Sequence, residues 1–568
     1  MSDNDYSSAS KEDHDPSALE KGLEPPEGYT ADQADNEAAD GAPLALRRTQ
    51  SRASQEGDLI ARVLSQSSLG SRLSRRDAKT PLPKMGGGRP YPPDLPQDRE
   101  QYKVDFDGPD DPIFPHNWKI TKKAVTCIVL GYTTMVTAWA SSSFSAAIPY
   151  IAANYGIGSV TATLGMTLYV LGFATGPVIW APLSELYGRK MPIVISMFGL
   201  TVFSFATAAA KDVQTIMLTR FFGGAVGSAP LAVVAAAFSD LFGNETRGLA
   251  LCVFSATVFV GPMLAPIVSG FIAYSYLGWR WTEYITGIMA ALALFLDVFF
   301  YTESYHPIIL VSKARELRRR TGNWGIFASQ ESVELDLHGI VVNNLGRPIY
   351  MLFREPILLI ITIYTAFVYG ILYLLLEAYP IVFMEGYQMK GGVAMLPYIA
   401  IAIGEVAGGL VMGFFLEPIY LKHLKRNNGK PVPEMRLLGA MLGAMAFPIG
   451  IFWFTWTGQY HEQVHWMAPT AAGVFIGFGL LSIFLGSINY IVDTYLVFAA
   501  SAMAANTFLR SACGAVFPLF APAMFHNLGT NWAGTLIGCI AILLMPMPFL
   551  FFKYGKKIRQ KSKYAFDL

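Results

Sequence analysis

The chain has 568 residues, of which 52% are hydrophobic and 15% are charged, and its formal net charge at pH 7 is +1. Soluble domains carry about 25% charged residues, so the composition indicates a membrane protein, and the near-neutral balance gives no sign of a nucleic-acid partner. The four cysteines lack CxxC and Cys/His spacing, so we expect neither a disulfide framework nor a metal site, and no cofactor.

Residues 1–120 are rich in Asp, Glu, Ser, Pro and Gly. Such a segment buries too little apolar surface to offset its chain entropy, so we expect a disordered cytosolic tail. The stretch RRTQSRAS places Thr49, Ser51 and Ser54 close after arginines, the charge context that basic-directed protein kinases favour. These three residues are therefore candidate phosphorylation sites.

Long apolar runs fill most of the remaining chain. A membrane-spanning helix needs roughly 20 mostly apolar residues, and runs of this length satisfy their backbone polar groups in lipid as helices. We expect twelve spans, at approximately 124–147, 160–181, 191–210, 214–237, 249–273, 282–301, 357–380, 393–416, 436–457, 468–492, 502–525 and 532–552.

These spans predict an all-α membrane protein with two six-helix bundles, the plan of a secondary transporter rather than an enzyme. We expect the first bundle at 121–301, a central cytosolic loop at 302–356, the second bundle at 357–552 and a basic cytosolic tail at 553–568.

Basic residues set the expected orientation. The outer loops hold Lys211, Arg280 and Lys390, whereas the central loop, with its stretch KARELRRR, and the tail KYGKKIRQKSKY are strongly basic. The positive-inside rule then puts both termini in the cytosol. KARELRRR could form a short helix on the membrane surface. Because the nucleotide-binding pattern GxxxxGK[ST] is absent, an ion gradient is the expected energy source.

The expected turn between spans two and three, APLSELYGRK, carries a candidate gating motif. Gly188 allows a tight turn, while Glu185, Arg189 and Lys190 can pair with one another or with helix termini as the bundles move. The segment resembles the GxLaDrxGRK signature of the major facilitator superfamily, with Ala181 in place of the glycine and Glu185 in place of the aspartate. The alternative is that these charges only set topology.

Span four contains Arg220 within LTRFFGGAVG. An arginine costs about 2.5–3.5 kcal/mol at the centre of an inserted helix, so it normally faces protein and finds a partner. The pattern resembles the RxxxG element of proton-coupled facilitators, which implies a part in proton transfer. A purely structural ion pair is the alternative.

Span five contains Gly261, Pro262, Pro266 and Gly270. Glycine and proline permit a kink and close approach of neighbouring helices. The sequence resembles the GPxxGG motif of drug:proton antiporters, although Ala-Pro replaces the paired glycines. The resemblance favours export over uptake, and a packing kink is the alternative.

Polar residues within the other spans are candidates for the binding site. In span seven Tyr369, Tyr373 and Glu377 share one helix face, and buried carboxylates beside aromatic rings suit amines or a proton. Further candidate substrate-binding residues are Glu283, Glu405, Asn489 and Asp493. Glu377, Glu405 and Asp493, together with Arg220, are candidates for proton coupling, and Arg510 could instead neutralise Asp493.

Residues 85–565 resemble the fungal polyamine exporters of the drug:proton antiporter family. The segments that carry the resemblance include GGGRPYPPDLP, APLSELYGRK, RFFGGAVGSAPLAVV, GILYLLLEAYPIVF and AASAMAANTFLRSACGAVFPLFA. The resemblance implies a monomeric, proton-coupled exporter of spermidine, spermine and putrescine at the plasma membrane, with overlapping drug resistance.

Three alternatives stay open at this point. The same fold could export drugs or weak acids as its main cargo, and the vacuolar membrane could be its location. The third is a non-transporting sensor that signals through its long N-terminal tail.

Overall fold

The computed structural model describes residues 86–88, 99–108, 110–243, 246–332, 346–427, 432–495, 498–560, 562 and 564. The candidate phosphorylation sites Thr49, Ser51 and Ser54 lie outside the described residues. Within the described ranges the regular elements are helices, and 12 of them are long and apolar enough to cross a membrane. The expected all-α architecture with twelve spans is therefore confirmed.

The first six spans begin and end close to the expected positions. They are α3 (Ile120–Ser142) with η5 (Ser145–Ala147) and α4 (Ile148–Tyr155), α5 (Ser159–Tyr187), α6 (Lys190–Ala209), α7 (Val213–Gly227) with α8 (Ala229–Leu241), α9 (Arg247–Ala273) and α10 (Arg280–Phe299).

The last six spans follow the central loop. They are α14 (Pro356–Pro380) with the π-helix η8 (Ile381–Gly386), η9 (Gly391–Met395) with α15 (Tyr398–Leu410), the π-helix η10 (Val411–Leu416) and α16 (Glu417–Arg426), η11 (Pro433–Arg436) with α17 (Leu437–Gln459), α18 (Met467–Tyr495), α19 (Ala499–Leu528) and α20 (Thr530–Leu544) with α21 (Pro546–Arg559).

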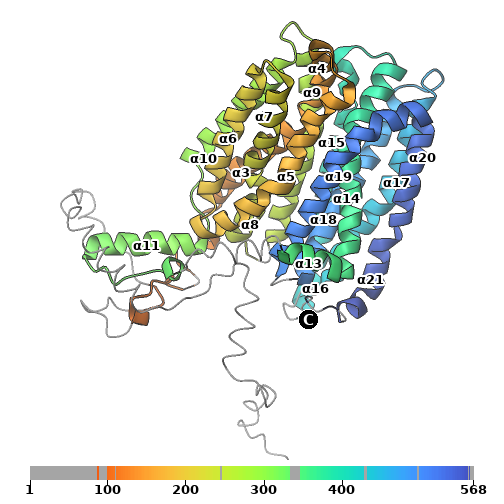
Figure 1. Cartoon of the computed structure of the whole chain (residues 1–568). Helices are drawn as coiled ribbons and strands as arrows, with labels where there is room; N and C mark the ends of the chain where they lie inside the picture. Colours follow the sequence, from red (N-terminus) through yellow and green to blue (C-terminus); the bar gives the residue numbers. More distant parts are fainter. Residues whose placement is uncertain are drawn as a thin grey trace, which may run out of the picture.

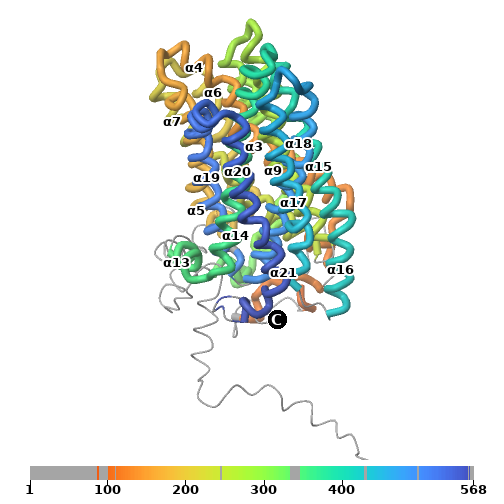
Figure 2. Tube along the Cα trace, turned by 90° about the vertical axis from the view of Figure 1, so that its right-hand side faces the viewer, coloured from red at the N-terminus to blue at the C-terminus, as the bar shows by residue number. Residues whose placement is uncertain are grey.

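The two sets of spans stand side by side (Figure 1). In the first set α5 packs on α7 and α6 on α10, and in the second set α14 packs on α19 and α17 on α18. Contacts of α5 with α19 and of α9 with α15 join the sets. Both views put α13, α16 and α21 at one end and α4 at the other (Figures 1 and 2). We call these the α11 end, after α11 (His306–Thr321), and the α4 end.

A small layer of non-spanning elements covers the first set at the α11 end. It combines η3 (Arg99–Tyr102), η4 (Pro115–Asn117), α11 and η6 (Ser329–Ser332). Tyr102 and Val104 are fully buried against α11, and the amide of Val104 donates to the carbonyl oxygen of Phe327 at 2.8 Å. The short helix considered for KARELRRR is thus present within α11.

Residues 99–108 and 110–119, which lie within the range expected to be a disordered tail, form part of this layer. The aromatic residues of this segment carry enough apolar surface to pack against α11, although the surrounding composition is polar. Lys313 holds the segment from α11, since its ammonium group donates to the carbonyl oxygen of Asp105 at 2.9 Å.

Candidate functional site

The turn between α5 and α6 is built around Gly188. Its φ of 91° and ψ of 171° lie in a region that is nearly exclusive to glycine. A Cβ at this position would meet Glu303 Oε2 at 2.4 Å. The backbone amides of Arg189 and Lys190 donate to the Glu303 carboxylate at 2.9 and 3.0 Å. The turn therefore cradles a carboxylate that follows α10, and it does so with backbone donors.

Arg189 continues this network toward α8. Its Nε lies 3.0 Å from Asp240 Oδ2, its Nη1 donates to Ser184 Oγ at 2.8 Å, and its guanidinium stacks on the ring of Tyr305. Of the partners left open for Arg189, the ion pair is provided by Asp240 near the end of α8 and not by Glu185. Sequence reasoning missed Asp240 and Glu303. Both stand where a span ends, which was the available signal.

The second set has a related cluster at the same end. Arg436 pairs with Asp493 at 3.0 Å and also with Glu417, and the Tyr420 hydroxyl donates to Asp493 at 2.8 Å. The sequence left open a neutralisation of Asp493 by Arg510, and the structure instead gives Arg436 as the ion-pair partner of Asp493. Asp493 lies near the end of α18 beside η11, whereas Arg510 lies about three turns inside α19. Asp493 thus belongs to the ion-pair cluster around Arg436.

Glu417 also joins the two sets of spans. A Cβ at Gly248, in the first turn of α9, would meet Glu417 Oε1 at only 1.9 Å. The carboxylate therefore lies against the amino-terminal turn of a helix from the other set, where a negative charge is stabilised by the helix dipole. Farther along the same seam Gly270 lies against Met395. The sets thus meet at both ends of the α9 seam.

Arg220 lies in a buried ion pair rather than facing lipid. Its Nη1 is 3.4 Å from Glu283 Oε1 and donates to the carbonyl oxygen of Ala140 at 2.9 Å, while its Nε donates to the carbonyl oxygen of Gly165 at 3.0 Å. Its guanidinium lies 4.4 Å from the ring centre of Tyr169. Four elements therefore meet at one cation, and Glu283 serves as its counter-ion within the first set.

The motif of span five lies inside an unbroken α9. Pro266 has no N–H to donate to the carbonyl oxygen of Pro262, and Ser142 Oγ of α3 supplies a hydrogen bond to that oxygen at 2.9 Å instead. Gly261 lies where a Cβ would be 2.9 Å from the carbonyl oxygen of Met135. The prolines and Gly261 thus permit close contact between α9 and α3.

An arginine–aromatic cluster crosses the seam between the two sets. Ser141 Oγ of α3 lies 2.8 Å from the Tyr373 hydroxyl of α14, and Tyr373 lies 3.4 Å from the Tyr369 hydroxyl. Arg510 stacks on Tyr369 and on Phe484, at 4.7 and 4.8 Å from the ring centres. Nε of Arg510 is buried, and no acceptor for it is found in the described part of the chain.

Two carboxylates lie beyond this cluster. Glu377 follows Tyr373 by one turn, and its Oε1 is buried without a hydrogen-bond partner among the described residues. Glu405 of α15 is fully buried, and within the same residues neither of its oxygens has a partner. The backbone of Glu405 lies against Gly477 of α18. Asn489 is buried on α18, about one helical turn before Asp493.

Metal chemistry receives no support from the side chains. Among the residues that the structure describes, no group of three His, Cys, Asp or Glu side chains could hold a metal ion.

Comparisons with known proteins agree with this architecture. Residues 130–518 match the family model described as Major Facilitator Superfamily. The chain belongs to the major facilitator superfamily. It is 51% identical to the major facilitator superfamily multidrug transporter FLU1 of Candida albicans, over 90% of this chain and 86% of that protein. It is 54% identical to the multidrug transporter TPO1_1 of Candida glabrata, over 85% of this chain and 84% of that protein.

A solved structure supports the fold independently. The xylose transporter XylE from E. coli, in a partially occluded inward open conformation, superposes with a TM-score of 0.54 at 16% identity. The superposition covers 76% of this chain and 98% of that chain. The resemblance to fungal drug:proton antiporters is confirmed by the relatives, and this chain is a membrane transporter and not an enzyme.

Proposed function

We propose that this transporter exports organic cations, including spermidine, spermine and putrescine, and drug-like molecules in exchange for protons. The observation that supports the proposal most is Glu377, a partly exposed carboxylate whose buried Oε1 lacks a partner in the described residues, one turn from the paired hydroxyls of Tyr369 and Tyr373. Aromatic rings attract cations through their quadrupole, and an intramembrane carboxylate can bind either a cation or a proton.

Competition for Glu377 gives a mechanism. Substrate from the cytosol binds to the carboxylate form, and the two sets of spans then rock so that the site opens outward. Proton binding removes the negative charge and weakens the hold on the cation, which leaves. The protonated site returns inward and releases its proton. Glu405, whose oxygens have no partner in the described residues, is a second candidate for the proton carrier.

We further propose that the α11 end faces the cytosol and that the protein resides in the plasma membrane, with the vacuolar membrane as the alternative. The basic residues near the ends of α11, α16 and α21 support the orientation, because they all lie at this end (Figure 1).

A second candidate is export of drugs or weak acids as the main cargo. Arg510 favours it, because a buried guanidinium stacked on Tyr369 attracts an anion and repels a cation. The printed names of the relatives, which are multidrug transporters, also favour a drug cargo. The polyamine assignment therefore requires that the attraction of a bound cation by Glu377 exceed its repulsion by Arg510.

The test is Glu377→Gln in inside-out vesicles that carry a proton gradient. Labelled spermidine uptake should fall at least tenfold, since the variant can neither hold the cation by charge nor exchange a proton. Glu462→Gln, at an exposed carboxylate outside the helices, is the matched control and should leave uptake unchanged. Unchanged uptake with an unchanged pH profile in Glu377→Gln would reject the role.

Competition separates the two candidate cargoes. Unlabelled spermine should displace labelled spermidine if polyamines are the main cargo, whereas drugs or weak acids should displace it far better under the second candidate. Arg510→Gln extends the test, because it should weaken competition by weak acids while leaving competition by spermine intact or stronger.

A further inference from the structure

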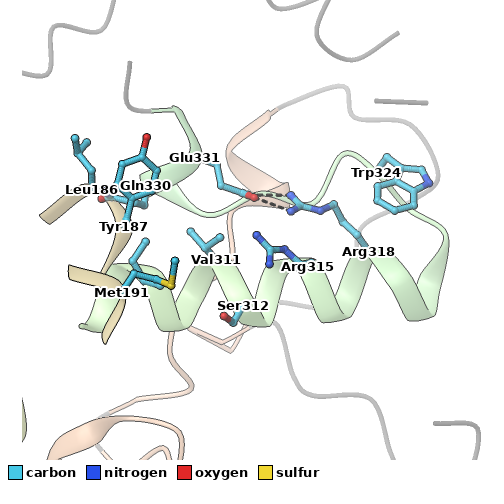
Figure 3. A pocket seen from close by; sticks show the side chains of 11 residues that line it. Leu186, Tyr187, Met191, Val311, Ser312, Arg315, Arg318, Trp324, Gln330 and Glu331 are labelled. Carbon is cyan, nitrogen blue, oxygen red and sulfur yellow. Dashed lines mark hydrogen bonds and ion pairs between the residues drawn. The ribbon is translucent and has the colours of Figure 1, made fainter. Parts of the chain in front are cut away.

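A pocket of about 620 Å³ lies at the α11 end, away from the central seam. It is an open pocket lined by α11, by the segment from Trp324 to Glu331 and by the residues on either side of the turn between α5 and α6 (Figure 3). Its apolar wall comes from Leu186, Met191 and Val311, and its polar wall includes Ser312 and Arg315.

The apolar wall continues into the surface of α6. Met191 is 55% exposed, and the exposed large apolar residues of α6 repeat from it at intervals of four and three residues, as Met191, Ile195, Phe198, Val202 and Phe205. This spacing is that of one helix face, and an exposed apolar stripe on a spanning helix faces lipid tails. The pocket is therefore the end of a lipid-facing surface.

The polar wall offers one positive charge that is not already neutralised. Arg318 lies 2.6 Å from Glu331, Arg320 pairs with Glu316, and Lys313 lies 3.8 Å from Asp111. For Arg315, by contrast, the described residues provide no ion pair or hydrogen bond, and its side chain is exposed. Figure 3 shows Arg315 on the same side of α11 as Arg318, the side that faces Glu331.

We propose that this pocket binds an anionic phospholipid from the leaflet at the α11 end. The phosphate lies on Arg315 with a hydrogen bond from Ser312, and an acyl chain runs along the α6 stripe from Met191. Charge complementarity and continuity with the lipid-facing stripe distinguish a lipid from a water-soluble phosphate, which would leave the apolar wall uncovered. Trp324 at the rim suits the headgroup region, where its ring is favoured.

The bound lipid would touch the gating turn. Leu186 and Tyr187 line the pocket and directly precede Gly188, and Gln330, also in the lining, donates to the carbonyl oxygen of Glu185 at 2.9 Å. Occupation of the pocket therefore braces one side of the turn that holds Glu303.

Native mass spectrometry of the full-length protein, released from mixed phosphatidylserine and phosphatidylcholine vesicles, tests the proposal. We expect preferential retention of phosphatidylserine, and about fivefold weaker retention in Arg315→Gln, as for loss of one basic contact at a membrane surface. Arg319→Gln is the matched control, because it removes the same charge from the same helix. Arg319 is 51% exposed and does not line the pocket. It should retain phosphatidylserine like the wild type.

A photoactivatable phosphatidylserine locates the site. Labelled peptides should include α11 and the start of α6, and Met191→Asp should abolish this labelling. Equal loss of retention in both arginine variants would overturn the proposal, since it would reduce the effect to net charge. Displacement of the lipid by free glycerophosphoserine, or labelling confined to other spans, would also overturn it.

Discussion

At the scale of single residues, Gly188 is the position where one methyl group should matter most. Ala at φ 91° and ψ 171° costs about 1–3 kcal/mol, and its Cβ would also displace the Glu303 carboxylate. We expect Gly188→Ala to lower the transport rate severalfold with the protein still present in the membrane. Initial rates in vesicles, normalised to protein amount, measure the effect.

Gly243 provides the control for this substitution. It lies near the same end, just after α8, and a Cβ there meets no described residue within 4 Å. Gly243→Ala should therefore transport at the wild-type rate. Equal rates for both variants would show that the turn tolerates a rearranged Glu303 and is not part of the gate.

Arg220 and Glu283 form the buried pair whose loss should be most costly for stability. Removing one partner leaves the other charged and buried, which costs about 3–5 kcal/mol. Arg220→Gln and Glu283→Gln should each destabilise the protein, and the double variant should lose less than the two single effects added together. Reversible unfolding in mixed micelles measures this.

Lys211→Gln, at an exposed loop cation, is the control for the pair and should be close to neutral. Strict additivity of the two single effects would contradict the assignment of Glu283 as the counter-ion of Arg220.

Sequence reasoning at this scale found residue types but not their partners. The turn was recognisable because a tight turn needs glycine, whereas Asp240 and Glu303 lie far from Arg189 in the sequence and follow no local pattern. Arg510 and Asp493 carry opposite charges on consecutive spans, so the sequence left a pairing between them open. In the structure Arg510 lies deep within α19 and stacks on Tyr369, while Asp493 lies near the end of α18 and pairs with Arg436. The spacing of residues along one helix does not show at which depth its side chains lie relative to a neighbouring helix.

At the scale of elements, the thickness of the bilayer made the membrane spans predictable from the sequence. The breaks and π-helices within those spans were harder to predict. Hydrophobic length follows directly from membrane thickness, so twelve spans could be counted from apolar runs. Span four is divided at Ser228, before Pro230, and span seven ends in a π-helix after Pro380. Proline predicts a disturbance of the hydrogen-bond ladder, but neighbouring helices decide whether the helix bends, breaks or continues, as α9 does across Pro262.

The contact between α9 and α16 should hold the two sets of spans together at the α11 end. Gly248→Ala would place a methyl group against the Glu417 carboxylate, so we expect the seam to open at this end. Cys252 reports such opening, because it is 4% exposed and packs in the seam with Met412 and Leu485. With the other three cysteines replaced by Ser, maleimide labelling of Cys252 should accelerate in Gly248→Ala.

Gly131→Ala is the matched control for this element. Its Cβ would meet Thr257 of α9 at 3.7 Å, which is an ordinary contact between α3 and α9. Labelling of Cys252 at the wild-type rate in both variants would show that the contact between Gly248 and Glu417 does not hold the two sets of spans together.

At the scale of the whole molecule, the layer at the α11 end is attached to the turn between α5 and α6. Tyr102 and Val104 pack on α11, Gln330 contacts Glu185, and Glu303 precedes α11 by three residues. Composition alone predicted a long disordered tail, because a polar average conceals a few aromatic residues that are buried only when the distant residues of α11 are present. The layer therefore belongs to the transporter core.

Deleting residues 2–85 tests this division between tail and core. The described residues begin at Gly86, and the amide of Gly87 donates to the carbonyl oxygen of Phe106 at 2.6 Å, so this deletion spares the described contacts of the layer and should leave vesicle transport within about twofold of the full chain. Tyr102→Asp in the full chain should instead reduce transport, since it buries a charge in the layer. Loss of transport on deletion together with normal transport in Tyr102→Asp would contradict the assignment of the layer to the transporter core. It would instead support a sensing or regulatory role for the tail.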